Sequence, residues 1–229
     1  MSKNPELIDR WWLDPVEDEN AMEEGHSPQW KAIIDLIQHD TLSGRTVLDF
    51  GCNQGGFLRQ LFAEKSFEKG IGVDIAQSSI EVANQRKGDL PIEYAAVTDL
   101  SAYKNSADIM VSNEVVYLLP DLKAHAQDSF QALKQGGEYY ISISSHTDNP
   151  QWPRWKKEID KFSAVPVQDY SLADIAQAFH EAGFKVSARP FRPEGFLEFV
   201  PGDFYTPTPA DVFEYYYRQK IMFKMMKPA

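Results

Sequence analysis

The stretch TVLDFGCNQGG, residues 46–56, joins a short apolar run to a glycine-rich turn. Short apolar runs bounded by turn residues are typical of buried strands, so 46–50 is predicted to be one. Gly51 and Gly55 lack a Cβ, which permits positive φ and lets a ligand approach the backbone closely. Asn53 lies between them, and asparagine also adopts the left-handed conformation readily. The stretch therefore predicts a strand that ends in a candidate ligand-binding turn.

Strand and helix patterns alternate on both sides of this turn. Ser27 and Pro28 are typical of a helix N-cap and a first-turn proline, so a helix is predicted over about 28–38. Ser78 and Glu81 have the spacing of a capping box, which predicts a helix from there to about residue 86. The other predicted helices cover 57–62, 122–133 and 171–182, and the other predicted strands cover 70–74, 92–97, 108–112, 138–144, 185–189 and 196–200.

The last two predicted strands are joined by only a short loop. Parallel neighbours need a crossover of about a dozen residues, so this pair is predicted to be antiparallel. The predicted fold class is therefore α/β, a three-layer sandwich with a seven-stranded mostly parallel sheet, the last strand antiparallel and helices on both faces. Two segments lie outside the alternation: residues 146–170, and the tail from 201, where Thr208 and Pro209 are predicted to start a final helix.

Length and composition indicate a single folded domain over residues 1–229. The apolar share of 43% and the charged share of 25% are ordinary for globular proteins. The single cysteine, Cys52, can form neither an internal disulfide nor a thiolate metal site. No apolar run approaches the roughly 20 residues of a membrane span, and the start lacks the apolar core of a secretory signal. The expected location is cytoplasmic, with no membrane association.

The charge balance bears on the partner. The formal net charge is -11, and the sequence has no compact Lys/Arg cluster beyond Lys156 and Lys157 and scattered cations near the C-terminus. Such a balance repels polyphosphate and argues against nucleic acid as the partner.

The residues around the turn discriminate among nucleotide sites. The turn has neither the Gly-x-Gly-x-x-Gly spacing nor a Gly-Lys-Ser/Thr ending, and an acid, Asp49, precedes Gly51 by two residues. An acid is unfavourable beside a pyrophosphate but can accept hydrogen bonds from a cationic amino group. Asp74 ends the next strand, where a carboxylate can bind both ribose hydroxyls, and Asp99 follows the third strand, where it can meet an adenine amino group. The alternatives are a strand-end capping acid for Asp74 and a loop or N-cap acid for Asp99.

With these motifs in this order, the chain resembles the class I S-adenosylmethionine-dependent methyltransferases of the small-molecule type. The matching residues are 47–57, 72–75, 98–100, 107–114 and 133–137, and the resemblance covers about 28–200. It implies S-adenosyl-L-methionine as the cofactor and, like the crossover rule, a seven-stranded sheet with an antiparallel last strand.

The resemblance also implies roles for individual residues. Asp49 and the backbone of 51–55 would lie near the methionine part of the cofactor, and Asn113 would lie beside the cofactor. Asp74 would bind the ribose and Asp99 the adenine. Asn53 departs from the pattern, because many members have a third glycine there. The full set of implied cofactor-binding residues is Asp49, Gly51, Cys52, Asn53, Gly55, Asp74, Ile75, Asp99, Leu100 and Asn113.

Methyl transfer from a sulfonium is an in-line displacement, so alignment of the reacting atoms supplies much of the catalysis. A general base helps if the acceptor is a hydroxyl or a protonated amine, and it should lie at the ends of the fourth and fifth strands. The candidates are Glu114, Tyr117 and His146. The alternatives are a solvated or capping acid for Glu114 and a solvent-exposed loop histidine for His146. No Asp-Asn pair follows 112–114 to complete a magnesium site, so no metal is predicted.

The predicted function is transfer of a methyl group to O or N of a small-molecule acceptor. The sequence at 112–115 is not of the Asn-Pro-Pro-Tyr type, which argues against the amino groups of nucleic-acid bases. A non-catalytic protein with the same nucleoside site is one alternative. A nicotinamide-dependent oxidoreductase is another, disfavoured by Asp49 and by the turn spacing.

Three segments are expected to surround the core of this methyltransferase domain: an N-terminal arm or lid at 1–26, an acceptor-covering segment at 146–170 and a C-terminal extension at 201–229. They hold aromatic residues with two possible roles, contact with ligands or packing against the core. These are Trp11, Trp12, Trp152, Trp155 and the aromatic side chains of 213–217, with Arg154 beside them.

Overall fold

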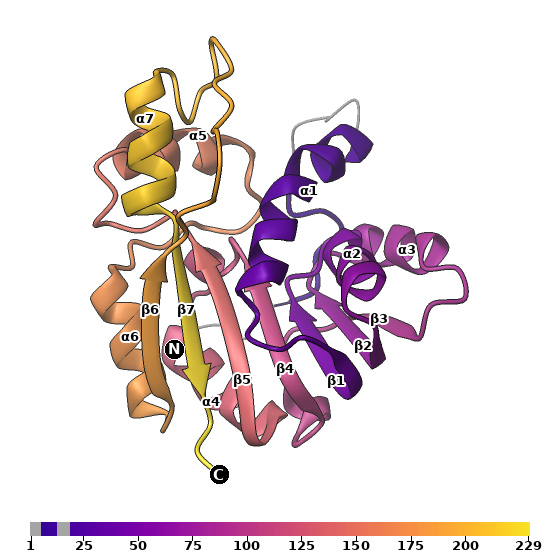
Figure 1. Cartoon of the computed structure of the whole chain (residues 1–229). Coiled ribbons are helices and arrows are strands. Elements are labelled where there is room, and N and C mark those ends of the chain that lie inside the picture. Colours follow the sequence, from indigo (N-terminus) through magenta and orange to yellow (C-terminus); the bar gives the residue numbers. More distant parts are fainter. Residues whose placement is uncertain (1–5, 13–18) are drawn as a thin grey trace.

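The computed structural model describes residues 6–12 and 19–229. A seven-stranded sheet has the order β3-β2-β1-β4-β5-β7-β6, with helices on both faces (Figure 1). The strands are β1 (Leu42–Phe50), β2 (Phe67–Asp74), β3 (Ile92–Ala96), β4 (Ala107–Asn113), β5 (Leu133–Ile143), β6 (Lys185–Pro190) and β7 (Ile221–Met226). The helices are α1 (Glu19–Leu36), α2 (Gly56–Glu64), α3 (Gln77–Arg86), α4 (Leu122–Ala132), α5 (Trp152–Phe162), α6 (Leu172–Glu181) and α7 (Pro209–Glu214), with short turns η1 (Ser101–Tyr103), η2 (Val116–Leu118) and η3 (Tyr215–Gln219). The predicted fold class is confirmed.

The strand order places the glycine turn where α/β sheets bind ligands. From β1 the chain moves outward to β2 and β3, and then crosses to the other side of β1 to form β4 and β5. β1 pairs in parallel with both β2 and β4, so the carboxyl ends of these strands meet at one edge. Open α/β sheets bind ligands outside such a reversal of strand order. The turn after β1 lies at this switch point.

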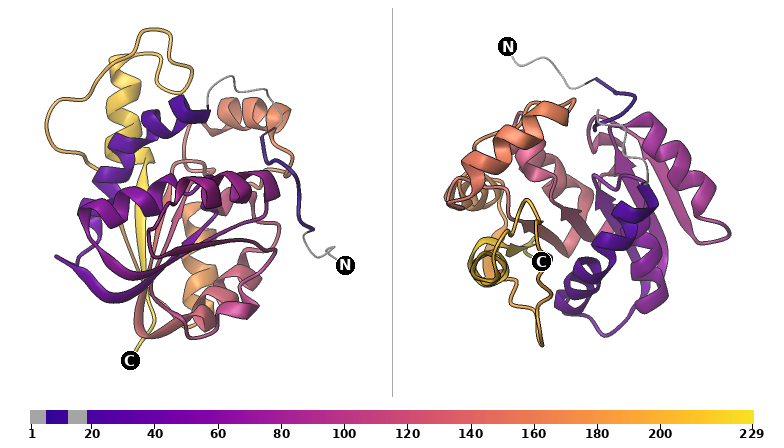
Figure 2. Two further views of the ribbon diagram at one scale, coloured as in Figure 1. Left: turned by 90° about the vertical axis from the view of Figure 1, so that its right-hand side faces the viewer. Right: turned by 90° about the horizontal axis from the view of Figure 1, so that it is seen from above.

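Side chains of β1 alternate between two apolar layers. Val47 belongs to a layer with Ile34 of α1 and Leu61 of α2, whereas Leu48 belongs to a layer with Phe179 of α6. The two further views show α1, α2 and α3 on one face of the sheet and α4 and α6 on the other (Figure 2). Helices α5 and α7 lie beyond the edge at which the parallel strands end (Figures 1 and 2).

The strand predicted over 196–200 is wrong. These residues form no strand, and Phe196 is fully exposed, at 107% of the reference area. The seventh strand is instead β7, which pairs antiparallel with both β5 and β6 and buries Phe223 and Met225. The aromatic run FLEFV has a higher β propensity than IMFKMM, but pairing with β5 and burial decide which segment joins the sheet.

Two predicted helix starts are also wrong. Helix α1 begins at Glu19 and continues through Pro28. The Ser27 hydroxyl caps no helix but donates to Gln60 Oε1 of α2 at 3.0 Å. Helix α3 has Ala76 as its N-cap, and the Ser78 hydroxyl donates to the carbonyl of Asp9.

Two other predicted caps are confirmed, because each side chain accepts a backbone N–H in the first turn of the helix that follows it. Ser171 forms a capping box with Asp174 at the start of α6, and Thr208 forms one with Asp211 at the start of α7. The unpatterned segment 146–170 contains α5, whose first turn carries Pro153.

Replacing Phe223 with Ala should lower the free energy of unfolding by about 3–5 kcal/mol, because the change removes a buried ring and leaves a cavity between β5 and β6. Phe196→Ala is the matched control, and its exposed ring should change stability by no more than about 0.5 kcal/mol. Urea denaturation measures both values. Equal effects of the two substitutions would contradict the placement of β7 in the core.

Candidate functional site

The turn after β1 requires left-handed backbone at three positions. Gly51, Asn53 and Gly55 have φ values of 75°, 45° and 77°. A Cβ on Gly51 would lie 2.3 Å from Val115, and a Cβ on Gly55 would lie 2.4 Å from Tyr94. The two glycines are therefore needed for both conformation and space, and Asn53 adopts the left-handed conformation expected for asparagine.

Asp74 ties this turn to the end of β2. Its Oδ2 accepts the backbone N–H of Asn53 at 2.8 Å, and its Oδ1 accepts the backbone N–H of Ala76 at 2.9 Å. Burial raises the pKa of Asp74, while these hydrogen bonds lower it in part. Each carboxylate oxygen has more than one lone-pair site, so Asp74 can accept further hydrogen bonds at the sheet edge.

Asp49 is a buried carboxyl group one residue before the end of β1. Burial raises its pKa to about 8, and the nearby charge of Asp74 adds to the increase. Both causes act in the same direction, so neither offsets the other. A cationic amino group placed beside Asp49 would favour its ionised form, because an opposite charge stabilises a carboxylate.

The other predicted cofactor residues have varied surroundings. Asp99 is exposed, and its Oδ1 accepts the backbone N–H of Ser101 at 2.8 Å; the Ser101 side chain and backbone lower its pKa. The Asn113 Oδ1 accepts the hydroxyl of Ser142 at 3.1 Å. Cys52 and Leu100 are buried, and Ile75 is half-buried beside Asp74.

Glu114 directly follows β4, so it lies at the same edge of the sheet as Asp74 but on the other side of β1. Its backbone is left-handed, with φ 53°, a conformation that is strained for a non-glycine residue. Its Oε1 accepts the Ser144 hydroxyl at 2.7 Å and pairs with Lys220 Nζ at 2.5 Å. Its Oε2 is buried and has no hydrogen-bond partner among the described residues.

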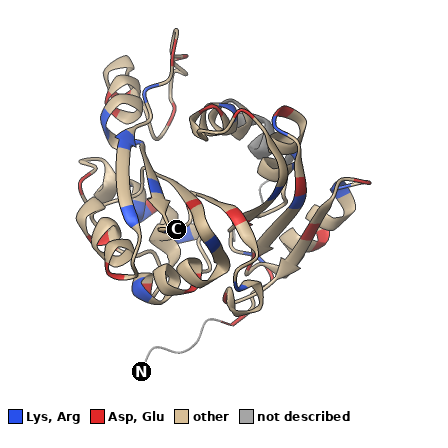
Figure 3. Cartoon of the chain, turned by 60° about the horizontal axis from the view of Figure 1, so that its bottom comes forward, with Lys and Arg blue, Asp and Glu red and all other residues tan. Residues whose placement is uncertain are grey.

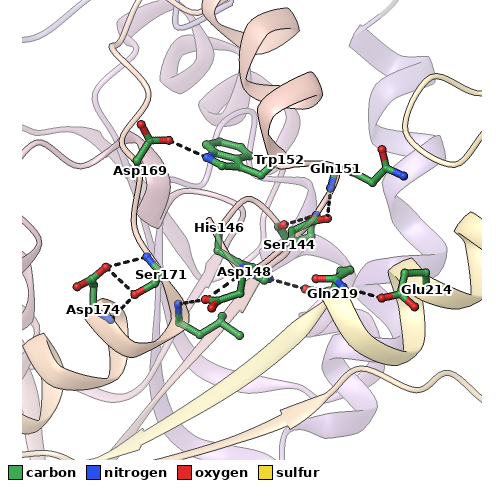
Figure 4. A network of polar contacts seen from close by, with 12 residues as sticks. Ser144, His146, Asp148, Gln151, Trp152, Asp169, Ser171, Asp174, Glu214 and Gln219 are labelled. Carbon is green, nitrogen blue, oxygen red and sulfur yellow. Dashed lines mark hydrogen bonds and ion pairs between the residues drawn. The ribbon is translucent and has the colours of Figure 1, made fainter.

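The two other predicted catalytic residues differ in their relation to Glu114. Tyr117 is buried in the core, with its ring edge-on to Trp152 at 5.8 Å; burial, followed by the charge of Glu114, raises its pKa. His146 is buried as well, at 1% exposure, so it is not a solvent-exposed loop residue. Its Nε2 lies 2.8 Å from the Gln219 carbonyl, in a polar network that joins the loop after β5 to the end of η3 (Figure 4).

The N-terminal arm runs along this edge. Ile8 pairs with the start of α3 through the bonds from Ile8 N–H to the Ile75 carbonyl and from Gln77 N–H to the Ile8 carbonyl. Trp12 bridges to Ser163, just after α5, and its ring packs on Phe162 at 5.4 Å. Residues 1–5 and 13–18 of the predicted arm at 1–26 lie outside the described part, and its last residues, from Glu19, belong to α1.

The aromatic residues of the acceptor-covering segment mostly pack. The Trp152 ring N–H donates to Asp169 Oδ1 at 2.8 Å. Trp155 is buried and packs on Tyr205 and Tyr215 at ring distances of 5.3 and 5.8 Å. Arg154 lies over the Phe204 ring at 4.8 Å. The tail therefore forms part of the wall around the segment after β5.

The described residues show neither a metal-binding cluster nor a membrane-spanning helix. Residues 6–12 and 19–229 contain no cluster of His, Cys, Asp and Glu with the arrangement of a metal site, and no helix there is long and apolar enough to cross a bilayer. Basic and acidic residues are interspersed along the ribbon (Figure 3).

Lys220 is the site residue that the sequence did not reveal. It is only 1% exposed, and it directly precedes β7. In the structure, the pairing of a buried lysine with an acid indicates a functional site. In the sequence, Lys220 belongs to the tail from 201, where no strand is predicted.

A family model described as "Methyltransferase domain" matches residues 22–188. The chain belongs to the class I S-adenosylmethionine-dependent methyltransferases. It is 30% identical over 148 residues to a ubiquinone biosynthesis O-methyltransferase of Idiomarina loihiensis, an alignment that covers 62% of this chain and 58% of that protein. It is 25% identical over 174 residues to phosphoethanolamine N-methyltransferase 1 of Triticum aestivum, covering 73% of this chain and 33% of that protein. The matches thus span three fifths or less of these relatives' lengths.

Solved methyltransferase structures share the fold. A chain from the complex between the Haloferax volcanii Trm112 methyltransferase activator and a methyltransferase superposes with a TM-score of 0.72 at 20% identity, covering 92% of this chain and 95% of that one. Geranyl diphosphate C-methyltransferase from Streptomyces coelicolor A3(2), solved with Mg²⁺, geranyl diphosphate and S-adenosyl-L-homocysteine, superposes with a TM-score of 0.67 at 16% identity, covering 98% and 95%.

The raised pKa of Asp49 predicts a pH-dependent stability difference in this methyltransferase without ligand. Because Asp49 ionises less readily in the folded chain, the unfolded state loses its proton first, and stability is lost as pH rises from about 4 to about 8. Asp49→Asn removes this loss, so the Tm of the variant minus that of the wild type should increase between pH 5 and 8.

Asp99→Asn is the control, because the lowered pKa of Asp99 lies below this pH range. Its Tm difference from the wild type should therefore stay constant between pH 5 and 8. Thermal unfolding monitored by circular dichroism measures both series. A Tm difference for Asp49→Asn that does not depend on pH would mean that Asp49 titrates normally.

Proposed function

We propose that this methyltransferase moves the methyl group of S-adenosyl-L-methionine to an oxygen or nitrogen atom of a small molecule. The observation that carries the proposal is the hydrogen bond from the backbone N–H of Asn53 to the Asp74 carboxylate, which holds the glycine turn against the end of β2. This geometry supports a nucleoside site at the switch point of the sheet.

The acids at or after the ends of β1, β2 and β3 fit the cofactor chemically. Asp49, a buried carboxyl group near the charge of Asp74, suits the methionine ammonium group, and Asp74 suits the ribose hydroxyls. Asp99 is exposed at the end of the loop after β3, where it would accept the adenine amino group. The bound cofactor supplies an electrophilic methyl group on a sulfonium.

Glu114 and Tyr117 are proposed to contact the acceptor. Both follow β4, on the other side of β1 from Asp74. For His146, the contact between its Nε2 and the Gln219 carbonyl favours a role in holding the tail. Its Nδ1 lies 3.9 Å from Asp148 Oδ2 and has no hydrogen-bond partner among the described residues.

The net charge of the chain and the names of several relatives both support a small-molecule acceptor. The names of the ubiquinone and phosphoethanolamine enzymes specify O- and N-methylation, and these support the same acceptor atoms here. A tRNA U34 carboxymethyltransferase of Sulfurovum is also 29% identical over 150 residues. The net charge of -11 favours a small molecule over RNA for this chain.

Isothermal calorimetry tests the cofactor site. The wild type should bind S-adenosylmethionine and its demethylated product but not NAD. Asp74→Ala should weaken binding by about 1–3 kcal/mol, because it removes the acceptor of two hydrogen bonds. Asp89→Ala, an exposed acid in the turn after α3, is the matched control and should bind normally. Binding of NAD alone, or unchanged affinity in Asp74→Ala, would contradict the proposed site.

Activity against a metabolite panel tests the reaction. Methyl transfer to at least one amine or hydroxyl compound is expected, with loss of transfer in Glu114→Gln at unchanged cofactor affinity. Cofactor binding without transfer to any compound would instead support the non-catalytic alternative.

A further inference from the structure

Lys220 reaches the acceptor side because of the direction of β7. Since β7 is antiparallel to β5, its first residues lie at the edge where the parallel strands end, and Ile221 pairs with Ile143. Lys220 comes immediately before Ile221 and is therefore beside the loop after β5. Its side chain is almost completely buried, at 1% exposure.

Lys220 contacts only one of the two oxygen atoms of the Glu114 carboxylate. Lys220 and the Ser144 hydroxyl both donate to Oε1, at 2.5 and 2.7 Å, whereas Oε2 is buried and has no partner in the described ranges. A buried polar atom without a hydrogen bond is costly, and each such atom in a folded protein calls for an explanation. A ligand that donates a hydrogen bond to Oε2 would remove the cost.

Lys220 also determines the charge of Glu114. Burial alone would raise the pKa of Glu114, but the charge of Lys220 and the hydrogen bonds of Lys220 and Ser144 outweigh it and lower the pKa. Desolvation and the Lys220 cation lower the pKa of His26 on α1. Among the described residues, the charge of Glu114 also raises the pKa values of Tyr117 on η2, Tyr205 before α7 and Tyr215 on η3, although burial is the larger cause for each. Tyr215 and Tyr216 on η3 in turn raise the pKa of Lys220.

We infer that Lys220 is a positioning residue for methyl transfer: it occupies Oε1 of Glu114 and leaves Oε2 to receive an N–H or O–H of the group to be methylated. The inference rests on the proposed function and narrows the acceptor to a hydrogen-bond donor, an amine or a hydroxyl. Ser144 supports the same orientation through its bond to Oε1.

Methyl transfer to nitrogen or to oxygen forms one bond, breaks one bond and releases one proton. A lone pair of the acceptor nitrogen or oxygen forms the new bond to the methyl carbon, and the carbon–sulfur bond breaks with its electron pair remaining on sulfur. The acceptor proton held at Oε2 passes to the carboxylate and then to water. A fixed carboxylate beside the atom that becomes positive lowers the barrier, because it is already oriented toward the developing charge.

Lys220→Met and Lys220→Arg separate this role from simple packing. Met keeps the length and apolar stem of the side chain without its charge, whereas Arg keeps the charge. Lys224→Met is the control, because Lys224 lies on β7, four residues after Lys220, and pairs with Glu138 at 2.6 Å instead.

The first measurement needs no acceptor. Carbon-13 NMR of glutamate-labelled protein, with the Glu114 signal assigned from Glu114→Gln, should show an ionised Glu114 from pH 5 to 8 in the wild type, in Lys220→Arg and in Lys224→Met. In Lys220→Met the same signal should titrate at a pH higher by at least about one unit. An unchanged titration in Lys220→Met overturns the inference, whether or not an acceptor has been found.

The second measurement uses the amine or hydroxyl compound that the wild type methylates. Lys220→Met should reduce kcat by at least about tenfold and move the acid limb of its pH profile upward, with the cofactor Kd unchanged. Lys220→Arg should recover part of the rate, and Lys224→Met should match the wild type. Full activity with an unmoved pH profile in Lys220→Met contradicts the inference.

The double variant Glu114→Gln/Lys220→Met covers the case in which Lys220→Met does not fold. It removes both buried charges, so it should fold and bind S-adenosylmethionine but lose transfer. Full transfer by the double variant overturns the inference. If the wild type binds the cofactor but methylates nothing, the proposed function fails, and the NMR titration still decides whether Lys220 sets the state of Glu114.

Discussion

The antiparallel pairing of β7 with β5 and β6 is the constraint on which the acceptor half of the site depends. A parallel strand would begin at the opposite edge of the sheet and carry Lys220 away from Glu114. The observed direction brings the start of β7 to the ends of β4 and β5, where Glu114 and Ser144 lie. The pair of Lys220 and Glu114 is thus a consequence of topology as much as of local sequence.

The cofactor half depends on a shorter-range constraint. Close packing leaves no room for side chains at Gly51 and Gly55, and the Asp74 carboxylate binds the Asn53 amide. Asp49 and Asp74 lie at the ends of neighbouring strands, where burial raises the pKa of both carboxyl groups and the charge of Asp74 raises that of Asp49 further. An opposite charge favours the ionised form of Asp49, so this arrangement of acids favours a sulfonium compound with an ammonium group.

The sequence predicted the features that depend on local chemistry. The left-handed turn follows from Gly51 and Gly55, and the starts of α6 and α7 follow from Ser171 and Thr208, which cap their own helices. Long-range contacts explain the misses. Ser27 and Ser78 resemble caps, but each bonds to a distant residue.

The seventh strand shows the same limit. Residues 196–200 have a strand-like composition but gain no strand partner, whereas 221–226 pair with both β5 and β6 and bury four of their six side chains. Because the predicted seventh strand is 196–200 instead of β7, the sequence does not indicate that Lys220 lies beside Glu114. The burial of His146 against Gln219 was hidden for the same reason.

The most direct test of the cofactor's place is an amide NMR titration with S-adenosylhomocysteine. The largest shift changes should occur at 49–55, 74–76 and 98–100, which surround the carboxyl ends of β1, β2 and β3. Changes confined to the loop after β5 and the tail, with the glycine turn unaffected, would contradict the account.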